Sequence, residues 1–147
     1  MTHDATGVSQ SALTAEESAR LHAALAQVAY ARLLGLELTA TERGAAVVAL
    51  VVRPELTRME GIVHGGALAS LVDTAAAFAV LSLLAPGEQT VTVDLTLHFL
   101  RPVETGRVAA QARVLRAGRR LVTVAVEATD DAGQLVATAL TTYAVRR

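Results

Sequence analysis

The chain has 147 residues, a formal net charge of −1 and a mean hydropathy of +0.43, and aliphatic rather than aromatic residues supply most of its hydrophobic content. It is long enough to bury one core, and the balanced charge argues against a surface that binds nucleic acid. Because the sequence contains no cysteine, disulfides, thiolate metal sites and cysteine nucleophiles are excluded.

The hydropathy pattern and the N-terminal residues predict the cellular location of the protein. The longest apolar run, residues 74–85, has 12 residues, whereas a membrane span needs about 20. The polar first residues lack the apolar segment of a signal peptide. We therefore expect a soluble cytoplasmic protein that does not enter a membrane. We also expect a disordered tail over residues 1–12 and a single domain over residues 13–147.

The first third of the domain predicts one helix and two strands. Thr14 and Glu17 have the spacing of a capping box, which predicts a helix over residues 14–34 that Gly35 ends. Strands are expected at residues 36–41 and 45–53, with a turn at residues 42–44 between them.

The remaining residues predict a long helix followed by four strands. Residues 64–84 are apolar nearly all round, which predicts a buried helix. Residues 90–99 alternate strictly between polar and apolar, which predicts a half-buried antiparallel strand with its apolar side chains on one face. The other strands are expected at residues 106–116, 120–129 and 135–145. We therefore predict an α+β fold in which a curved antiparallel sheet wraps one long central helix, with a further helix at the N-terminus.

Two features of the long helix predict chemistry. Gly65 and Gly66 stand at its mouth, where a substrate can approach the backbone and the first N–H groups lack an internal partner. Such N–H groups could stabilise a carbonyl oxygen that becomes negative, although tight packing of small residues is an alternative. Asp73 lies two turns further on, where a lone buried carboxylate is costly. It is our candidate catalytic residue, with a bonded structural carboxylate as the alternative.

The spacing of these groups predicts a dimer. Gly65 and Asp73 are eight residues apart, which is about 12 Å along a helix axis. A reacting carbonyl has to lie within about 3 Å of both the oxyanion donor and the attacking group. If both groups act, they must come from different chains, so we expect a homodimer with shared active sites.

Three other polar residues of this helix are weaker candidates. The imidazole of His64 could brace the loop or a substrate oxygen, or it could simply bond nearby backbone at the start of the helix. Ser70 and Ser82 do not lie in a G-x-S-x-G motif, and we interpret both as packing residues. His, Asp and Glu nowhere have the spacing of metal ligands, so we expect neither a metal nor a cofactor.

Three segments together resemble a known family. They are GIVHGGALASLVDT at residues 61–74, TVDLTLHFLRP at 92–102 and DDAGQLVATA at 130–139. They resemble the hotdog-fold acyl-CoA thioesterases, closest to the phenylacetic-acid-degradation type and the 4-hydroxybenzoyl-CoA type with an HGG loop. The resemblance implies a central helix in a six-stranded antiparallel sheet. It also implies dimers whose sheets join edge to edge, and dimers that pair into tetramers.

The resemblance further implies the reaction and its residues. Family members hydrolyse acyl-CoA or aryl-CoA thioesters without a metal or cofactor. The acid that matches Asp73 serves as general base or nucleophile, and the glycine that matches Gly65 polarises the thioester carbonyl through its N–H. Where the family often has Asn or Gln to orient the carbonyl or water, this chain has Arg58. Arg58 could pair with Asp73, bind a substrate carboxylate or point to solvent.

The CoA part of the substrate and its acyl group each suggest further contacts. CoA is polyanionic, so Arg101, Arg119 and Arg120 are candidates for contacting its phosphates, with solvated turn arginines as the alternative. Ala77 and Phe78 follow Asp73 by about one turn and are candidates for lining the acyl pocket.

Two other functions compete with hydrolysis. A hotdog dehydratase or hydratase would commonly carry a His a few residues after the acid, and here Thr-Ala-Ala-Ala-Phe follows Asp73. A non-catalytic acyl-CoA-binding protein is the second alternative, and Arg58 is its best support. A DNA-binding regulator would need an additional domain, for which residues 1–34 are too short and not basic enough.

Overall fold

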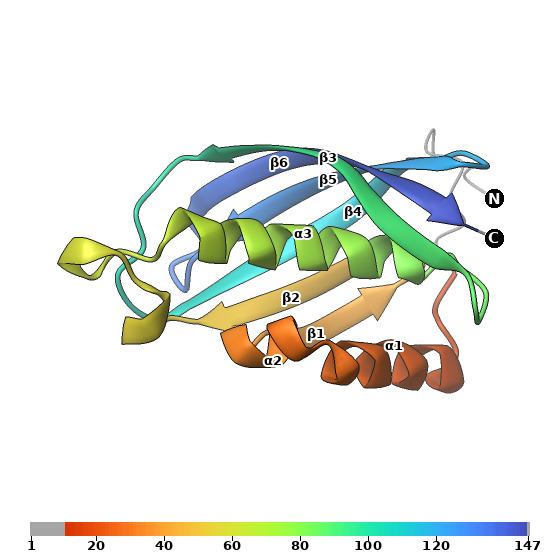
Figure 1. Ribbon diagram of the computed structural model, residues 1–147, viewed down its shortest axis with the longest axis horizontal. Helices are drawn as coiled ribbons and strands as arrows, with labels where there is room; N and C mark the ends of the chain where they lie inside the picture. Colours follow the sequence, from red (N-terminus) through yellow and green to blue (C-terminus); the bar gives the residue numbers. More distant parts are fainter. Residues whose placement is uncertain (1–10, 147) are drawn as a thin grey trace.

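The computed structural model describes residues 11–146, and it has the predicted α+β architecture. A six-stranded antiparallel sheet curves around one long helix (Figure 1). The predicted tail at residues 1–12 lies almost entirely outside the described residues. In chain order the elements are α1 (Ala15–Gln27), α2 (Ala29–Leu34), β1 (Glu37–Glu42), β2 (Ala45–Val51), the short 3₁₀ turns η1 (Pro54–Leu56) and η2 (Met59–Gly61), α3 (Gly65–Leu81), β3 (Gln89–Phe99), β4 (Arg107–Ala117), β5 (Leu121–Thr129) and β6 (Leu135–Arg146).

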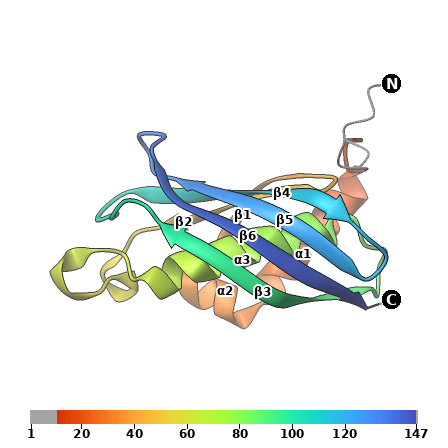
Figure 2. The ribbon, with the colours of Figure 1, turned by 90° about the horizontal axis from the view of Figure 1, so that it is seen from above.

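The sheet and α3 form the two layers of the molecule. The strand order is β1-β2-β4-β5-β6-β3, so β1 and β3 are the edge strands. Figure 2, turned by 90° from Figure 1, shows the sheet lying over α3, while α1 and α2 lie on the far side. Among residues 11–146, no helix has the length and apolarity that a membrane crossing requires.

Small side chains on α3 allow the sheet to wrap it closely. The helix buries mostly alanine and aliphatic residues, among them Leu71, Val72, Ala75, Ala76, Ala79 and Val80, each of which is fully buried. A narrow stripe along α3 stays partly accessible: Gly66, Ala69, Ser70, Asp73, Ala77 and Leu81. Each of these residues lies three or four positions from another of the set, so they share one face of the helix.

The N-terminal helix differs from the single helix that we predicted. It is divided at Val28, whose backbone is extended (φ −77°, ψ 104°) and separates α1 from α2. Both predicted ends are confirmed: Thr14 Oγ1 accepts from the Glu17 N–H at 3.1 Å, and Gly35 closes α2 with φ 71°. The Thr14 N–H and then the Arg43 guanidinium donate to the Glu17 carboxylate and lower its pKa.

Strand β3 also differs from the prediction of one apolar face. A bulge between Thr92 and Asp94 shifts the register against β6, so that the side chains exchange faces at this point. Val91 and Val93 are 64% and 57% exposed, whereas Thr92 is half-buried and lies against α3. A bulge adds one residue to a strand, and hydrophobic alternation alone cannot reveal it.

Hydrogen bonds from β6 stabilise this bulge. The Thr142 N–H donates to Asp94 Oδ1 at 2.9 Å, and Thr141 Oγ1 donates to the Asp94 carbonyl at 2.6 Å. The residue skipped in the register is Val93, and these bonds fix both the side chain and the main chain of Asp94, which follows it.

Ser82 is buried, as expected for a packing residue, and it also forms two hydrogen bonds that the sequence did not predict. It is 2% exposed, and its Oγ accepts the Gly44 N–H at 2.7 Å while donating to the Ala79 carbonyl at 2.7 Å. The serine thus joins the end of α3 to the turn between β1 and β2.

We expect Ser82→Ala to lower the free energy of unfolding by about 1–3 kcal/mol, because it leaves the buried Gly44 N–H without an acceptor. Urea titration followed by circular dichroism measures this change. The matched control is Ser11→Ala at an exposed serine, which should change the stability by less than about 0.5 kcal/mol. Equal effects of the two substitutions would contradict the role of Ser82.

Candidate active site

The loop before α3 is fixed by main-chain bonds to distant segments. The Val63 N–H donates to the Val103 carbonyl and the His64 N–H donates to the Leu56 carbonyl, both at 2.8 Å. These bonds hold the residues just before α3 against the segment that follows β3 and against η1. The position of the helix N-terminus is therefore set by contacts across the fold rather than by the glycines alone.

His64 caps this helix, and in doing so leaves one N–H group open. Its Nδ1 accepts the Gly66 N–H at 2.8 Å, and its carbonyl accepts the Ala67 N–H at 2.9 Å. This is the backbone-bonding alternative considered for His64. Within residues 11–146, the Gly65 N–H is then the single donor of the first turn that has no hydrogen-bond partner. A carbonyl oxygen placed there would meet a free donor at the positive end of a helix dipole.

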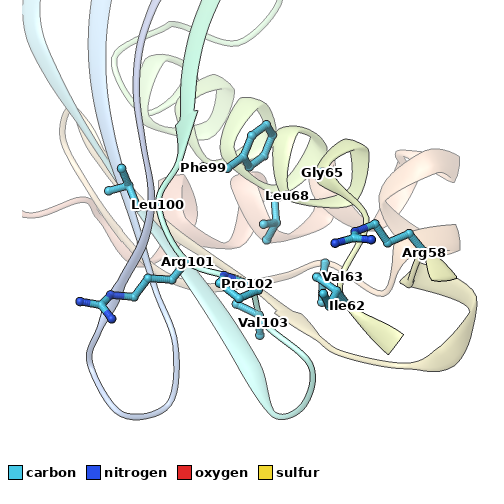
Figure 3. Close-up of a pocket in the computed structure, with 10 residues that line it drawn as sticks. All are labelled: Arg58, Ile62, Val63, Gly65, Leu68, Phe99, Leu100, Arg101, Pro102 and Val103. Carbon is cyan, nitrogen blue, oxygen red and sulfur yellow. The ribbon is translucent and has the colours of Figure 1, made fainter. Parts of the chain in front are cut away.

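The Gly65 backbone also borders a pocket of about 330 Å³. An added Cβ at this position would lie 3.2 Å from the nearest ring carbon of Phe99, which explains why a glycine is suited here. The other lining residues include Leu68, Phe99, Arg58 and Arg101. Figure 3 shows Arg58 directed toward Leu68, whereas Arg101 is directed away. The pocket therefore combines an apolar wall, a free N–H and a guanidinium group.

Asp73 lies elsewhere on α3 and is held through one of its two carboxylate oxygens. Oδ1 accepts a hydrogen bond from Thr92 Oγ1 at 2.9 Å and one from the Tyr143 hydroxyl at 2.5 Å. The same hydroxyl lies 2.6 Å from the main-chain carbonyl of Asp73. Oδ2 has no hydrogen-bond partner among the described residues. One oxygen is thus fixed and the other is open for chemistry.

Sequence reasoning missed both donors to Asp73. Thr92 seemed to lie on the polar face of β3, because the bulge that reverses its direction was not visible in the alternation. Tyr143 carried a signal that could have been used: it is one of only two tyrosines, in a strand built mostly of small and apolar residues. A buried phenol needs a hydrogen-bond partner, and the lone carboxylate of the apolar helix needs a donor.

The electrostatics of Tyr143 follow from its position. The side chain is 1% exposed. Burial, and then its hydrogen bond to the Asp73 carboxylate, raise the pKa of Tyr143 above the ordinary value for a phenol. The hydroxyl therefore stays protonated at all working pH values and remains a donor to Asp73.

The structure also places the candidates Arg58, Ala77 and Phe78, which were predicted to contact substrate or Asp73. Arg58 forms an exposed ion pair with Glu60 at 3.5 Å and does not contact Asp73. Ala77 lies on the accessible stripe of α3, whereas Phe78 is 4% exposed and packs in the core. This burial does not favour Phe78 as a substrate contact.

The arginines proposed to contact phosphates lie at opposite ends of the sheet. Arg119 and Arg120 are exposed in the turn between β4 and β5. Leu121 next to them pairs with Ala144, opposite the start of β3, while Arg101 follows the end of β3. One protomer therefore does not bring these arginines together.

The two halves of the site are also separated within one protomer. Gly65 adjoins Phe99 and Asp73 bonds Thr92, and these two residues of β3 are seven positions apart, which corresponds to about 20 Å along a strand. The helix spacing of Gly65 and Asp73 gives about 12 Å. Neither separation allows both groups to contact one carbonyl.

Comparison with known proteins identifies the family. A model of the thioesterase superfamily matches residues 60–137, which is more than half of the chain. The chain belongs to the thioesterase superfamily. A Saccharolobus solfataricus protein is 37% identical to this thioesterase over 114 residues, covering 78% of this chain and 75% of its own.

Two further relatives cover nearly the whole thioesterase. The medium/long-chain acyl-CoA thioesterase YigI of Salmonella typhimurium is 29% identical over 150 residues, covering 90% of this chain and 97% of its own. The structure of the PaaI protein of E. coli, from its phenylacetic acid degradation operon, has a TM-score of 0.84 at 28% identity and covers 92% of this chain and 97% of its own. The hotdog fold and the assignment as a thioester hydrolase are thereby confirmed.

The buried tyrosine predicts how stability of this thioesterase depends on alkaline pH. The unfolded chain releases the Tyr143 proton at about pH 10, while the folded chain retains it. The contribution of Tyr143 to the free energy of unfolding is therefore complete below about pH 10 and is lost as the pH rises further. We expect the difference in free energy of unfolding between the wild type and Tyr143→Phe to fall between about pH 9 and pH 11. Urea titrations across this range measure it.

Tyr30→Phe is the matched control for this experiment, because it also removes a phenol hydroxyl, from an exposed tyrosine that is bonded to Ser70 and not to Asp73. A Tyr143→Phe difference that stays constant up to pH ~11 would contradict the raised pKa of Tyr143.

Proposed function

We propose that the protein hydrolyses acyl-CoA thioesters to a free acid and CoA, at two active sites that are shared between the protomers of a dimer. The observation that carries this proposal is the carboxylate of Asp73, which is held by Thr92 and Tyr143 and keeps one oxygen open. The similarity to the acyl-CoA thioesterase YigI supports CoA esters as the substrate class.

The site offers two routes for the reaction. In the first, Asp73 Oδ2 accepts a proton from a water molecule, whose oxygen attacks the thioester carbonyl. In the second, Oδ2 attacks the carbonyl itself to form a mixed anhydride, which water then hydrolyses. In both routes the C–S bond breaks and CoA leaves as a thiolate that takes up a proton. The negative charge on the carbonyl oxygen is stabilised by the N–H of the partner subunit's Gly65.

Strand β3 supports a shared site, because it is a long unpaired edge. It has 11 residues without proline or glycine, and Val91 and Val93 on it are exposed. Such an edge is suited to pair with a second copy. Antiparallel pairing of two β3 strands about a point between Leu95 and Thr96 would set Thr92 beside the partner subunit's Phe99. That register would bring Asp73 close to the partner's Gly65.

The accessible stripe of α3 and the pocket beside it suggest how substrate would lie. Ala69 and Ala77 flank Asp73 with small side chains, which leaves room for an aryl or a medium-length acyl group. Arg58 borders the Gly65 pocket and could contact the CoA part or a carboxylate of the substrate. Pairing of dimers into tetramers remains part of this proposal.

We expect Asp73→Ala and Asp73→Asn each to lower kcat by about 10²- to 10⁴-fold, because neither side chain can act as base or nucleophile. A panel of aryl- and fatty-acyl-CoA esters, followed by release of free thiol, measures the loss and shows the preferred acyl group. Glu104→Gln, at an exposed carboxylate, is the matched control. CoA-ester binding without turnover by the wild type would favour a non-catalytic binder, and turnover that survives both substitutions would place the active site elsewhere.

A shared site also predicts that two inactive variants restore each other. We would combine Asp73→Asn chains with Gly65→Val chains, the latter having a side chain that collides with Phe99. Each mixed dimer then has one site with both native residues, so an equal mixture should recover about a quarter of the wild-type activity. The separately assayed variants serve as controls. Recovery no greater than their average would show that the two residues do not act across the dimer.

A further inference from the structure

The two donors to Asp73 form one structural unit of the sheet. Thr92 of β3 and Tyr143 of β6 are direct partners in the antiparallel register, and both side chains lie against α3. Because of the bulge that follows Thr92, Thr92 faces α3 on the same strand as the inward-facing Leu95 and Leu97. Bulges next to active sites commonly re-aim side chains in this way.

Tyr143 makes a second contact that a simple packing residue would not need. Its hydroxyl has one proton but lies within hydrogen-bond distance of two acceptors, Asp73 Oδ1 at 2.5 Å and the Asp73 carbonyl at 2.6 Å. Both acceptors belong to the same residue. The phenol therefore ties the orientation of the carboxylate to the backbone of α3, and Thr92 fixes the same oxygen from the side of β3.

We infer that Tyr143, together with Thr92, is a positioning residue for thioester hydrolysis: the pair fixes Asp73 through Oδ1 and thereby assigns Oδ2 as the reacting oxygen. This inference rests on the proposed function. The terminal torsion of an aspartate is otherwise broad, so a free side chain would sample many directions of attack. Fixing it before the substrate binds removes an orientational cost from the reaction.

The structure predicts distinct effects on kcat and KM. Tyr143→Phe keeps the ring in the core but removes the hydroxyl, and we expect kcat to fall on the order of 10- to 100-fold while KM changes less than about 3-fold. Thr92→Val keeps the shape and removes the donor, so kcat should fall. Thr92→Ser keeps a hydroxyl and should retain most of the activity.

A matched control is available on α2. The Tyr30 hydroxyl also forms a hydrogen bond, with Ser70 Oγ at 2.9 Å, but it does not contact Asp73. Tyr30→Phe should therefore leave kcat within about 2-fold of the wild type. Circular dichroism and the urea midpoint of each variant would show whether the fold is intact.

A spectroscopic measurement tests the contact without relying on activity. The chain has two tyrosines and no tryptophan, so Tyr143 is the only tyrosine of the Tyr30→Phe variant. Its ionisation can be followed by the ultraviolet absorbance of tyrosinate. Adding Asp73→Asn removes a neighbouring negative charge, and we expect the pKa of Tyr143 to move downward. A tyrosine that only fills the core would not respond to this substitution.

The outcomes separate the inference from the proposed function. An active wild type, a Tyr143→Phe variant with kcat unchanged and a Tyr143 ionisation that does not respond to Asp73→Asn would overturn the positioning role alone. A wild type that hydrolyses no acyl-CoA ester would overturn the proposed function, and with it the role in hydrolysis, even if the titration shows the contact. A loss of kcat in Tyr143→Phe and Thr92→Val, with Thr92→Ser active, is the expected result.

Discussion

A carboxylate on a helix that a sheet encloses needs hydrogen-bond donors, and much of the structure around α3 meets this need. Asp73 is half-buried between a largely apolar helix and the sheet, where water can solvate only part of its carboxylate. Its donors come from the side chains of Thr92 and Tyr143 on two neighbouring strands. The carboxylate is held firmly on one side and remains open on the other, which is the condition that both routes of hydrolysis require.

The bulge that interrupts the alternation of β3 provides one of the donors to Asp73. A regular strand with Leu95 and Leu97 facing the core would direct Thr92 away from α3. The bulge at this point reverses the side chains, and the bonds from β6 to Asp94 hold it. The same reversal places Val91 and Val93 on the outside, near an unpaired edge. One irregularity thus supports both the proposed catalytic carboxylate and the proposed contact with a second copy.

At the N-terminus of α3, some N–H groups are hydrogen-bonded within the helix cap, and one is left for the proposed contact with substrate. The ring of His64 satisfies the Gly66 N–H and its carbonyl satisfies the Ala67 N–H, so the helix start is capped without help from solvent. The Gly65 N–H remains available beside the pocket. This donor and Asp73 lie about 12 Å apart along one helix, which is the reason why the proposed active site combines residues of two protomers.

The sequence by itself determined the central helix, the succession of strands along the chain and the capping box at Thr14, and it singled out Gly65 and Asp73 as candidates. These depend on local periodicity, on helix-end chemistry and on the cost of a carboxylate in an apolar segment, all of which are visible along the chain. Only the tertiary structure decided that Tyr143 and Thr92 hold Asp73. That contact joins residues 70 and 19 positions apart, and it depends on a strand register and a bulge that no local pattern encodes.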